Sequence, residues 1–297
     1  MTGILILDKQ KGMTSFKAVR KAAGILGVKK AGHTGTLDPM ATGVLVCMMS
    51  HSTRFIELLP EHNKSYTARV RLGTVTDTLD ITGNILSENP VNVSLDELLS
   101  ASEKFKGEIL QTPPMYSALK KDGKKLYDLA RQGIEIEREK RKITIYELSI
   151  YDFDGKEFSM DVKCSAGTYI RSLCDDLGRV LGCGACLTEL RRTSANGFKI
   201  EDAVTLEELS LMKDNGNALE KIIPIDKALE FYPAITVSAK QANRFHNGGE
   251  LSHDRLPKNY YVGIYRVYSP ANSFLGLGEI KEDKGDLTVK RVLVLDE

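Results

Sequence analysis

The densest group of residues able to do chemistry lies in the segment AGHTGTLDPMATGVL, residues 31–45. It holds one carboxylate, Asp38, followed by Pro39, and one imidazole, His33, five residues before Asp38. Glycines let the backbone come close to a ligand, and Pro39 restricts Asp38 to extended geometry and so aims its side chain. A lone, positioned carboxylate suits attack on, or stabilisation of, an electrophilic sugar carbon. His33 offers a flat ring for stacking or a proton relay.

Two other interpretations of this segment compete with catalysis. Asp is a preferred N-cap and Pro is favoured at the first helical position, so Asp38 can simply begin a helix that continues from Met40. The Asp-Pro pair taken alone favours this cap. The three glycines of the segment do not match G-x-G-x-x-G, and no Gly-Lys-Ser/Thr follows them, which disfavours a nucleotide-phosphate loop.

Hydrophobic periodicity predicts the elements that position the segment. Strict alternation predicts half-buried strands over residues 64–73 and 158–164. Helical spacing, which begins after Thr14-Ser15 in the first case, predicts helices over residues 14–26, 94–106, 123–132 and 170–181. Alternating strands interspersed with helices predict an α+β domain on a mixed, largely antiparallel sheet.

The pattern changes character between Pro224 and Pro233. Beyond it, turns rich in Pro, Asn and Gly separate three predicted strands, at residues 260–268, 274–280 and 287–295. We therefore expect a second, small and mostly β domain of roughly 65 residues.

Composition sets looser bounds on function. The 297 residues carry a net charge of +1, which gives no global sign of nucleic acid or membrane. Residues 119–142 nevertheless hold nine Lys or Arg against five Asp or Glu, a basic patch that can hold phosphates or simply form a solvated helix face. The apolar run at residues 4–7 is too short for a signal sequence or membrane span. Five cysteines with a single C-x-x-C, at Cys183 and Cys186, favour reduced thiols in the cytosol over a zinc site.

The residue 31–45 segment resembles the catalytic loop of the TruB family, tRNA pseudouridine synthases that act on the T-arm uridine at position 55 of tRNA. Further motifs of that family follow in family order: LDKQKGMTS at residues 7–15, KSY at 64–66, DTLDITG at 77–83, PPMYSALK at 113–120, YDLAR at 127–131, GTYIRSL at 167–173 and LRRT at 190–193. Two departures are Gln10, where Pro is usual, and Asn196-Gly197 before Phe198, where Gly is common. Because Asn tolerates left-handed backbone geometry, that turn can survive.

The resemblance implies a pseudouridine synthase domain at residues 1–228, with a thumb-like RNA-binding insertion at about 112–142, and a PUA-like RNA-binding domain at 229–297. It implies that uracil leaves its ribose at N1, turns and rejoins through C5. This isomerisation transfers no external group and needs no cofactor or metal. The expected partner is the T-arm stem-loop of tRNA, with no membrane and no obligate protein partner, and the expected protein is a cytoplasmic monomer.

The resemblance also assigns roles to single residues. Asp38 is the expected catalytic carboxylate, acting as a nucleophile or as a base, and Arg171 its expected ion-pair partner, which would keep it ionised. From spacing alone, Arg171 instead reads as the i,i+4 partner of Asp175. His33 is expected to fill the gap left by the extruded base. The expected walls of the uracil pocket are Tyr66, Tyr169 and Leu190. Each of these side chains could instead belong to the ordinary hydrophobic core. Expected phosphate contacts are Lys120, Lys121, Lys124, Lys125 and Arg131.

Two other classes of function are weighed against a cofactor-free RNA isomerase. One is a non-catalytic RNA-binding or chaperone module that kept the cleft, against which the intact Asp38, Tyr66 and Arg171 argue. The other is a metal-dependent nuclease or deaminase. The chain has no H-x-E…P-C-x-x-C arrangement to support a deaminase.

Overall fold

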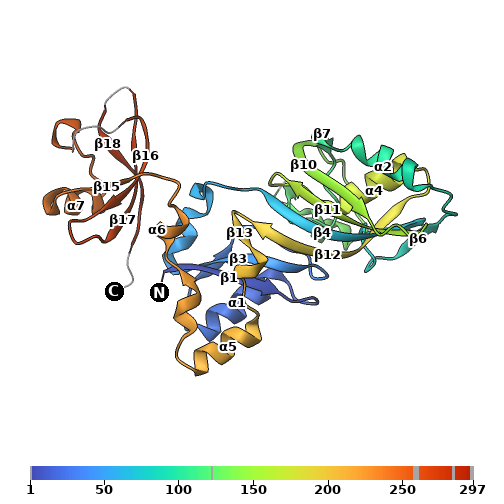
Figure 1. Cartoon of the computed structure of the whole chain (residues 1–297), viewed down its shortest axis with the longest axis horizontal. Coiled ribbons are helices and arrows are strands. Elements are labelled where there is room, and N and C mark those ends of the chain that lie inside the picture. The colour runs from blue at the N-terminus through green and yellow to red at the C-terminus, as the bar shows by residue number, and fades with distance from the viewer. Residues whose placement is uncertain (1, 122, 257–260, 283–284, 295–297) are drawn as a thin grey trace.

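A computed structural model describes residues 2–121, 123–256, 261–282 and 285–294 of the chain (Figure 1). Within these ranges one large mixed sheet carries the N-terminal part of the molecule. Its main path runs β14-β1-β3-β12-β4-β11-β10-β7, with β13 paired to β12 and β2 paired to β3. Every pairing in it is antiparallel except that of β12 with β3. The predicted mixed, largely antiparallel α+β architecture is therefore confirmed.

The strands of this sheet are β1 (Gly3–Lys9), β2 (Ala31–His33), β3 (Thr42–Met49), β4 (Lys64–Leu72), β7 (Gly107–Gln111), β10 (Arg141–Tyr151), β11 (Glu157–Cys164), β12 (Ala185–Ala195), β13 (Phe198–Lys199) and β14 (Ile222–Ile223). Two small hairpins lie outside it: β5 (Thr74–Thr76) with β6 (Ile85–Glu88), and β8 (Lys120–Lys121) with β9 (Lys124–Lys125). The predicted strands at residues 64–73 and 158–164 correspond to β4 and β11.

Helices cover the sheet in two groups (Figure 1). Near β1 and β3 lie α1 (Ser15–Ile25) and α5 (Leu206–Asp214), whose apolar side chains share a buried cluster with Leu5, Leu7 and Leu45. Near the other end lie α2 (Leu95–Glu103) and α4 (Ile170–Val180), packed on the cluster that contains the buried side chains of β4 and β11. Further helical segments are η1 (Ser50–Leu58), α3 (Leu126–Ala130), η2 (Ile200–Asp202), η3 (Ala218–Lys221), α6 (Ile225–Ala228) and η4 (His253–Arg255).

Local sequence signals account for several of these boundaries. The hydroxyl of Thr14 accepts the backbone N–H of Lys17, so α1 begins at its predicted cap. Asn196 takes a left-handed φ of 54°, the geometry expected of the Asn-Gly turn. The helix predicted over residues 123–132 is wrong at its start. Lys124 and Lys125 pair with β8, Gly123 has φ of 79°, and α3 keeps only five residues.

The C-terminal part forms a separate four-stranded sheet in the order β15 (Ala234–Thr236), β16 (Gly263–Tyr268), β17 (Phe274–Ile280) and β18 (Leu287–Val292), beside α7 (Ala239–His246). The three predicted strands are confirmed as β16, β17 and β18, while their outer ends at residues 260 and 295 lie outside the described residues. This sheet packs on η1. Phe274 lies 6.1 Å from Phe55 between ring centroids, and the Tyr232 hydroxyl donates to the Leu58 carbonyl at 3.0 Å. Within the described ranges, no helix combines the length and apolar character needed to cross a membrane.

Candidate functional site

Asp38 lies in the loop between β2 and β3, and it does not begin a helix. The Ala41 N–H donates to the Asp38 carbonyl at 3.1 Å in a single turn, after which the chain enters β3 at Thr42. The Pro39 carbonyl accepts a hydrogen bond from the Gly12 N–H at 2.7 Å. The helix-cap interpretation is therefore wrong, because β3 pairs with β1 from Gly43 to Met49 and so extends the chain where local sequence favours a helix.

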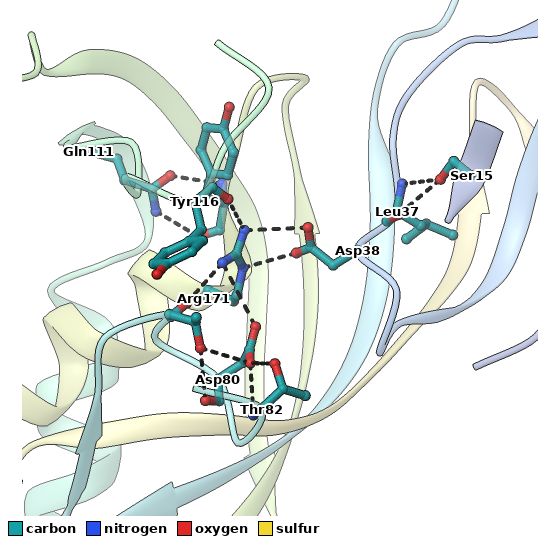
Figure 2. A network of polar contacts seen from close by, with 10 residues as sticks. Ser15, Leu37, Asp38, Asp80, Thr82, Gln111, Tyr116 and Arg171 are labelled. Atoms are coloured by element: carbon teal, nitrogen blue, oxygen red, sulfur yellow. Dashed lines mark hydrogen bonds and ion pairs between the residues drawn. The ribbon is translucent and has the colours of Figure 1, made fainter. Parts of the chain in front are cut away.

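The loop is clamped to the start of α1. The buried Ser15 hydroxyl accepts the Leu37 N–H at 2.8 Å and donates to the Leu37 carbonyl at 2.9 Å (Figure 2). The residue before Asp38 is thus held at both of its backbone polar groups. This double contact fixes the direction in which the Asp38 side chain leaves the loop.

The Asp38 carboxylate meets the Arg171 guanidinium at two points. Arg171 Nε lies 2.9 Å from Oδ2 and Nη2 lies 3.4 Å from Oδ1 (Figure 2). The Arg171 side chain is 5% exposed, whereas that of Asp38 is 34% exposed, so part of the carboxylate stays open to a ligand. The local pairing of Arg171 with Asp175 is wrong, because Asp175 pairs with Arg179 at 2.8 Å.

Arg171 is held by groups from two other segments. Its Nη1 donates to the Thr78 carbonyl at 2.8 Å, and its Nη2 donates to the Tyr116 carbonyl at 2.7 Å. The Asp80 carboxylate lies 3.8 Å from Nη1. The orientation of the guanidinium is therefore fixed by contacts within the protein.

Asp80 is a site residue that the sequence pattern alone does not single out. Its Oδ1 accepts the Thr82 N–H at 2.9 Å, the Thr82 hydroxyl at 2.5 Å and the Thr78 hydroxyl at 3.0 Å. It is buried, and the preceding Leu79 has a left-handed φ of 64°. The available signal was the motif DTLDITG itself, whose threonines provide donors at the spacing a turn brings together.

Two opposing effects act on the Asp38 carboxyl. Burial raises its pKa, because the surrounding protein displaces most of the water that would stabilise the charge. This holds even though 34% of the Asp38 side chain is exposed. The Arg171 guanidinium acts in the opposite direction, while the Asp80 charge adds to the rise. The net direction is upward, so the carboxylate binds a proton more readily than an ordinary aspartate.

The three expected pocket walls come from β4, β12 and the start of α4. Tyr66 on β4 is 7% exposed and Leu190 on β12 is 8% exposed, and both belong to the buried cluster that contains Leu37. Burial raises the pKa of the Tyr66 hydroxyl. Tyr169 stands at the start of α4, where the Gln111 side chain binds its N–H at 2.8 Å and its carbonyl at 3.0 Å (Figure 2).

His33 ends β2 on the other side of the loop. Its Nδ1 is buried and has no hydrogen-bond partner among the described residues. Burial, together with the charge of Arg192, lowers its pKa and so favours the neutral ring. A neutral ring suits stacking against a base.

The predicted phosphate contacts form a separate basic surface on β8, β9 and α3. Four of them, Lys120, Lys124, Lys125 and Arg131, border one hollow of about 630 Å³. Lys121 instead donates to the Glu137 carbonyl at 2.9 Å. The structure therefore brings Asp38 and Arg171 into direct contact and leaves the lysines outside that pair. Within the part of the chain that the structure describes, no three His, Cys, Asp or Glu side chains gather as metal ligands would.

Comparison with known proteins matches three family models along the chain. They are described as "TruB family pseudouridylate synthase (N terminal domain)" at residues 23–170, "tRNA pseudouridylate synthase B C-terminal domain" at 171–230 and "Pseudouridine synthase II TruB, C-terminal" at 233–293. The chain is 45% identical to a tRNA pseudouridine synthase B of Clostridium kluyveri over 95% of this chain and 96% of the relative. It is 46% identical to a tRNA pseudouridine synthase B of Azoarcus sp. over 98% of this chain and 94% of that relative.

Solved structures resemble the chain over nearly its whole length. A Cbf5-Nop10-Gar1 complex contains a chain with a TM-score of 0.72 and 28% identity, covering 98% of this chain and 84% of that one. An H/ACA RNP bound to a substrate RNA containing 2′-deoxyuridine gives a TM-score of 0.71 and 26% identity, covering 99% and 85%.

Proposed function

We propose, because this chain belongs to the TruB family of pseudouridine synthases, that it isomerises uridine to pseudouridine in tRNA through the carboxylate of Asp38. The proposed target is the T-loop uridine at position 55. The observation that carries the assignment of Asp38 is its two-point ion pair with the nearly buried Arg171, which leaves part of the carboxylate open.

The reaction needs one group that works on the sugar. The C1′–N1 bond breaks, its electron pair leaves with uracil, and C1′ becomes electron-poor. An ionised carboxylate beside C1′ stabilises that centre. The uracil then turns, the C1′–C5 bond forms, and the proton on C5 is lost while N1 gains one. No redox change or external group enters this balance.

The other site residues act on position and charge. Arg171 holds the carboxylate at both oxygens and opposes the rise in its pKa, and so favours the ionised form. Asp80 orients the guanidinium from the far side. Tyr66, Tyr169 and Leu190 would flank the flipped uracil, since stacking on apolar and aromatic side chains is how flipped bases are held. His33 would fill the gap left in the RNA.

We assign the domains as expected from the sequence: a catalytic domain at residues 1–228 with its RNA-gripping insertion at about 112–142, and an RNA-binding domain at 229–297. We also propose a monomer as the working unit, since the ion pair of Asp38 with Arg171 forms within one chain. A cytoplasmic location fits the five cysteines, all of which are free thiols.

The test is chemical mapping of pseudouridine in a T-arm stem-loop and in whole tRNA after incubation with the purified protein in a chelating buffer. The proposal expects conversion at position 55 alone. Conversion at another position, or none, would contradict it.

A further inference from the structure

Arg192 on β12 is a buried cation that has no carboxylate partner among the described residues. The residue is 0% exposed. Its Nε donates to the Val44 carbonyl at 2.7 Å and its Nη2 to the Gly35 carbonyl at 3.1 Å, while Nη1 has no partner among the described residues. The neighbouring Arg191, by contrast, pairs with Asp8 at 2.7 Å. A buried charge is normally paired, because losing water without a partner is costly.

A second cation lies directly beside it. The ammonium of Lys64 and the Nη1 of Arg192 stand 3.0 and 3.7 Å from the point that a Cβ on Gly35 would occupy. The glycine therefore lets both cations approach the loop. Lys64 also forms no ion pair with a carboxylate within the described ranges. Burial and the Arg192 charge both lower the pKa of Lys64, which is the electrostatic cost of this arrangement.

The two cations border the proposed uracil pocket. Lys64 and Tyr66 are two residues apart on β4 and so point to the same face of the sheet. Arg192 is the register partner of Tyr66 on β12. Gly35 precedes Asp38 by three residues in the same loop. An anion bound at Lys64 would therefore lie next to the nucleotide on which Asp38 acts.

We propose that Lys64, with Arg192 behind it, binds one backbone phosphate of the RNA next to the target uridine. This inference rests on the proposed function. A phosphodiester supplies the counter-charge that neither cation has within the described part of the chain, and an ammonium binds it as a point charge. Holding that phosphate fixes the ribose of the flipped nucleotide relative to Asp38, so binding and positioning come from one contact.

The test replaces single phosphates of the T-arm stem-loop by neutral methylphosphonates, one position at a time across the loop. With the unaltered protein, one position flanking the target uridine should weaken binding by about 10- to 100-fold, the range of a charged hydrogen bond. Lys64→Met should weaken binding of the all-phosphate RNA by a similar factor. In that variant, a methylphosphonate at the same position should change the affinity by no more than about twofold. A merely structural role for Lys64 would not single out one phosphate.

Lys163→Met is the matched control. Lys163 lies on the adjoining β11, and its ammonium pairs with Glu147 at 3.2 Å on the opposite face of the sheet. This variant should keep the full methylphosphonate effect. Inorganic phosphate added as a competitor tests the other source of the same chemistry. If it displaces the RNA from the unaltered protein but not from Lys64→Met, while no methylphosphonate position matters, the site takes free phosphate and the inference is wrong.

Three results separate the possible failures. A methylphosphonate scan that finds no sensitive flanking position in the unaltered protein overturns the inference without using any variant. A sensitive position that stays equally sensitive in a folded Lys64→Met protein also overturns it. If the all-phosphate RNA is bound but never converted to pseudouridine, the proposed function has failed instead.

Discussion

Arg171 and Asp38 stand 133 residues apart in the chain and form a two-point ion pair, with Nε 2.9 Å from Oδ2 and Nη2 3.4 Å from Oδ1. One partner comes from the first turn of α4 and the other from the loop before β3. Since Thr78 and Tyr116 also bind the guanidinium through their carbonyls, four separate segments converge on this pair.

The ion pair predicts the pH dependence of catalysis. Activity requires the ionised Asp38, whose pKa is raised above the ordinary value of 3.8. As the pH is lowered, the rate should therefore begin to fall at a higher pH than it would with an ordinary aspartate. Arg171→Met removes the group that opposes this rise. It should therefore move the acid limb to still higher pH and slow the reaction by about 100-fold, through misplacement of the carboxylate. Single-turnover rates measured across pH check both effects.

Arg171→Lys provides the comparison for that experiment. It keeps a positive charge but loses the two-point geometry. We expect an acid limb closer to that of the unaltered protein, with a slower rate. An acid limb unchanged in Arg171→Met would contradict the electrostatic role of the arginine.

Gly43 should be intolerant of any side chain. It has a φ of 100°, and a Cβ there would overlap the Arg192 carbonyl oxygen where β3 meets β12. Gly43→Ala should lower the free energy of unfolding by about 3 kcal/mol or more, as expected for backbone strain combined with steric overlap. The matched control is Gly24→Ala in α1, where a Cβ meets nothing within 4 Å. That change should raise stability by about 0.5–1 kcal/mol. Denaturant titration measures both.

The basic surface on β8, β9 and α3 should act on affinity and not on chemistry. Lys124→Met should weaken RNA binding several-fold and reduce the slope of log K against log salt by about 0.7–0.9, the value for one phosphate contact. The single-turnover rate at saturating protein should not change. Lys213→Met, an exposed position on α5, serves as the control and should alter neither quantity. An unchanged salt slope in Lys124→Met would contradict phosphate contact at this surface.

Local sequence patterns predicted most of the helices and strands. They failed where pairing with a strand outside the local sequence window determines the secondary structure. The alternation in residues 64–73 sufficed for β4, and a cap with apolar spacing sufficed for α1. The helix that the Asp38-Pro39 pair favours locally is absent because β3 pairs with β1, a contact that no local window contains. The start of α3 differs for a similar reason, since Lys124 and Lys125 are used by a short hairpin.

The residues of the candidate site also differ in whether local sequence is enough to identify them. Asp38 and Arg171 were found because a family resemblance carries information about distant contacts; spacing alone paired Arg171 with Asp175. Asp80 received no role because its importance depends on burial and on the guanidinium facing it. Arg192 was passed over because an arginine in an Arg-Arg pair normally lies at the surface, whereas here β12 turns it into the interior.

The most direct test of the account is Asp38→Asn with a T-arm stem-loop. Among the described residues, the hydrogen bond and ion pair of the Asp38 carboxylate are both to Arg171, so the variant should fold and still bind RNA. We predict no detectable pseudouridine in a single-turnover assay with saturating, folded protein. Pseudouridine formed at an appreciable fraction of the unaltered rate would show that the carboxylate of Asp38 is not the group that acts on the sugar.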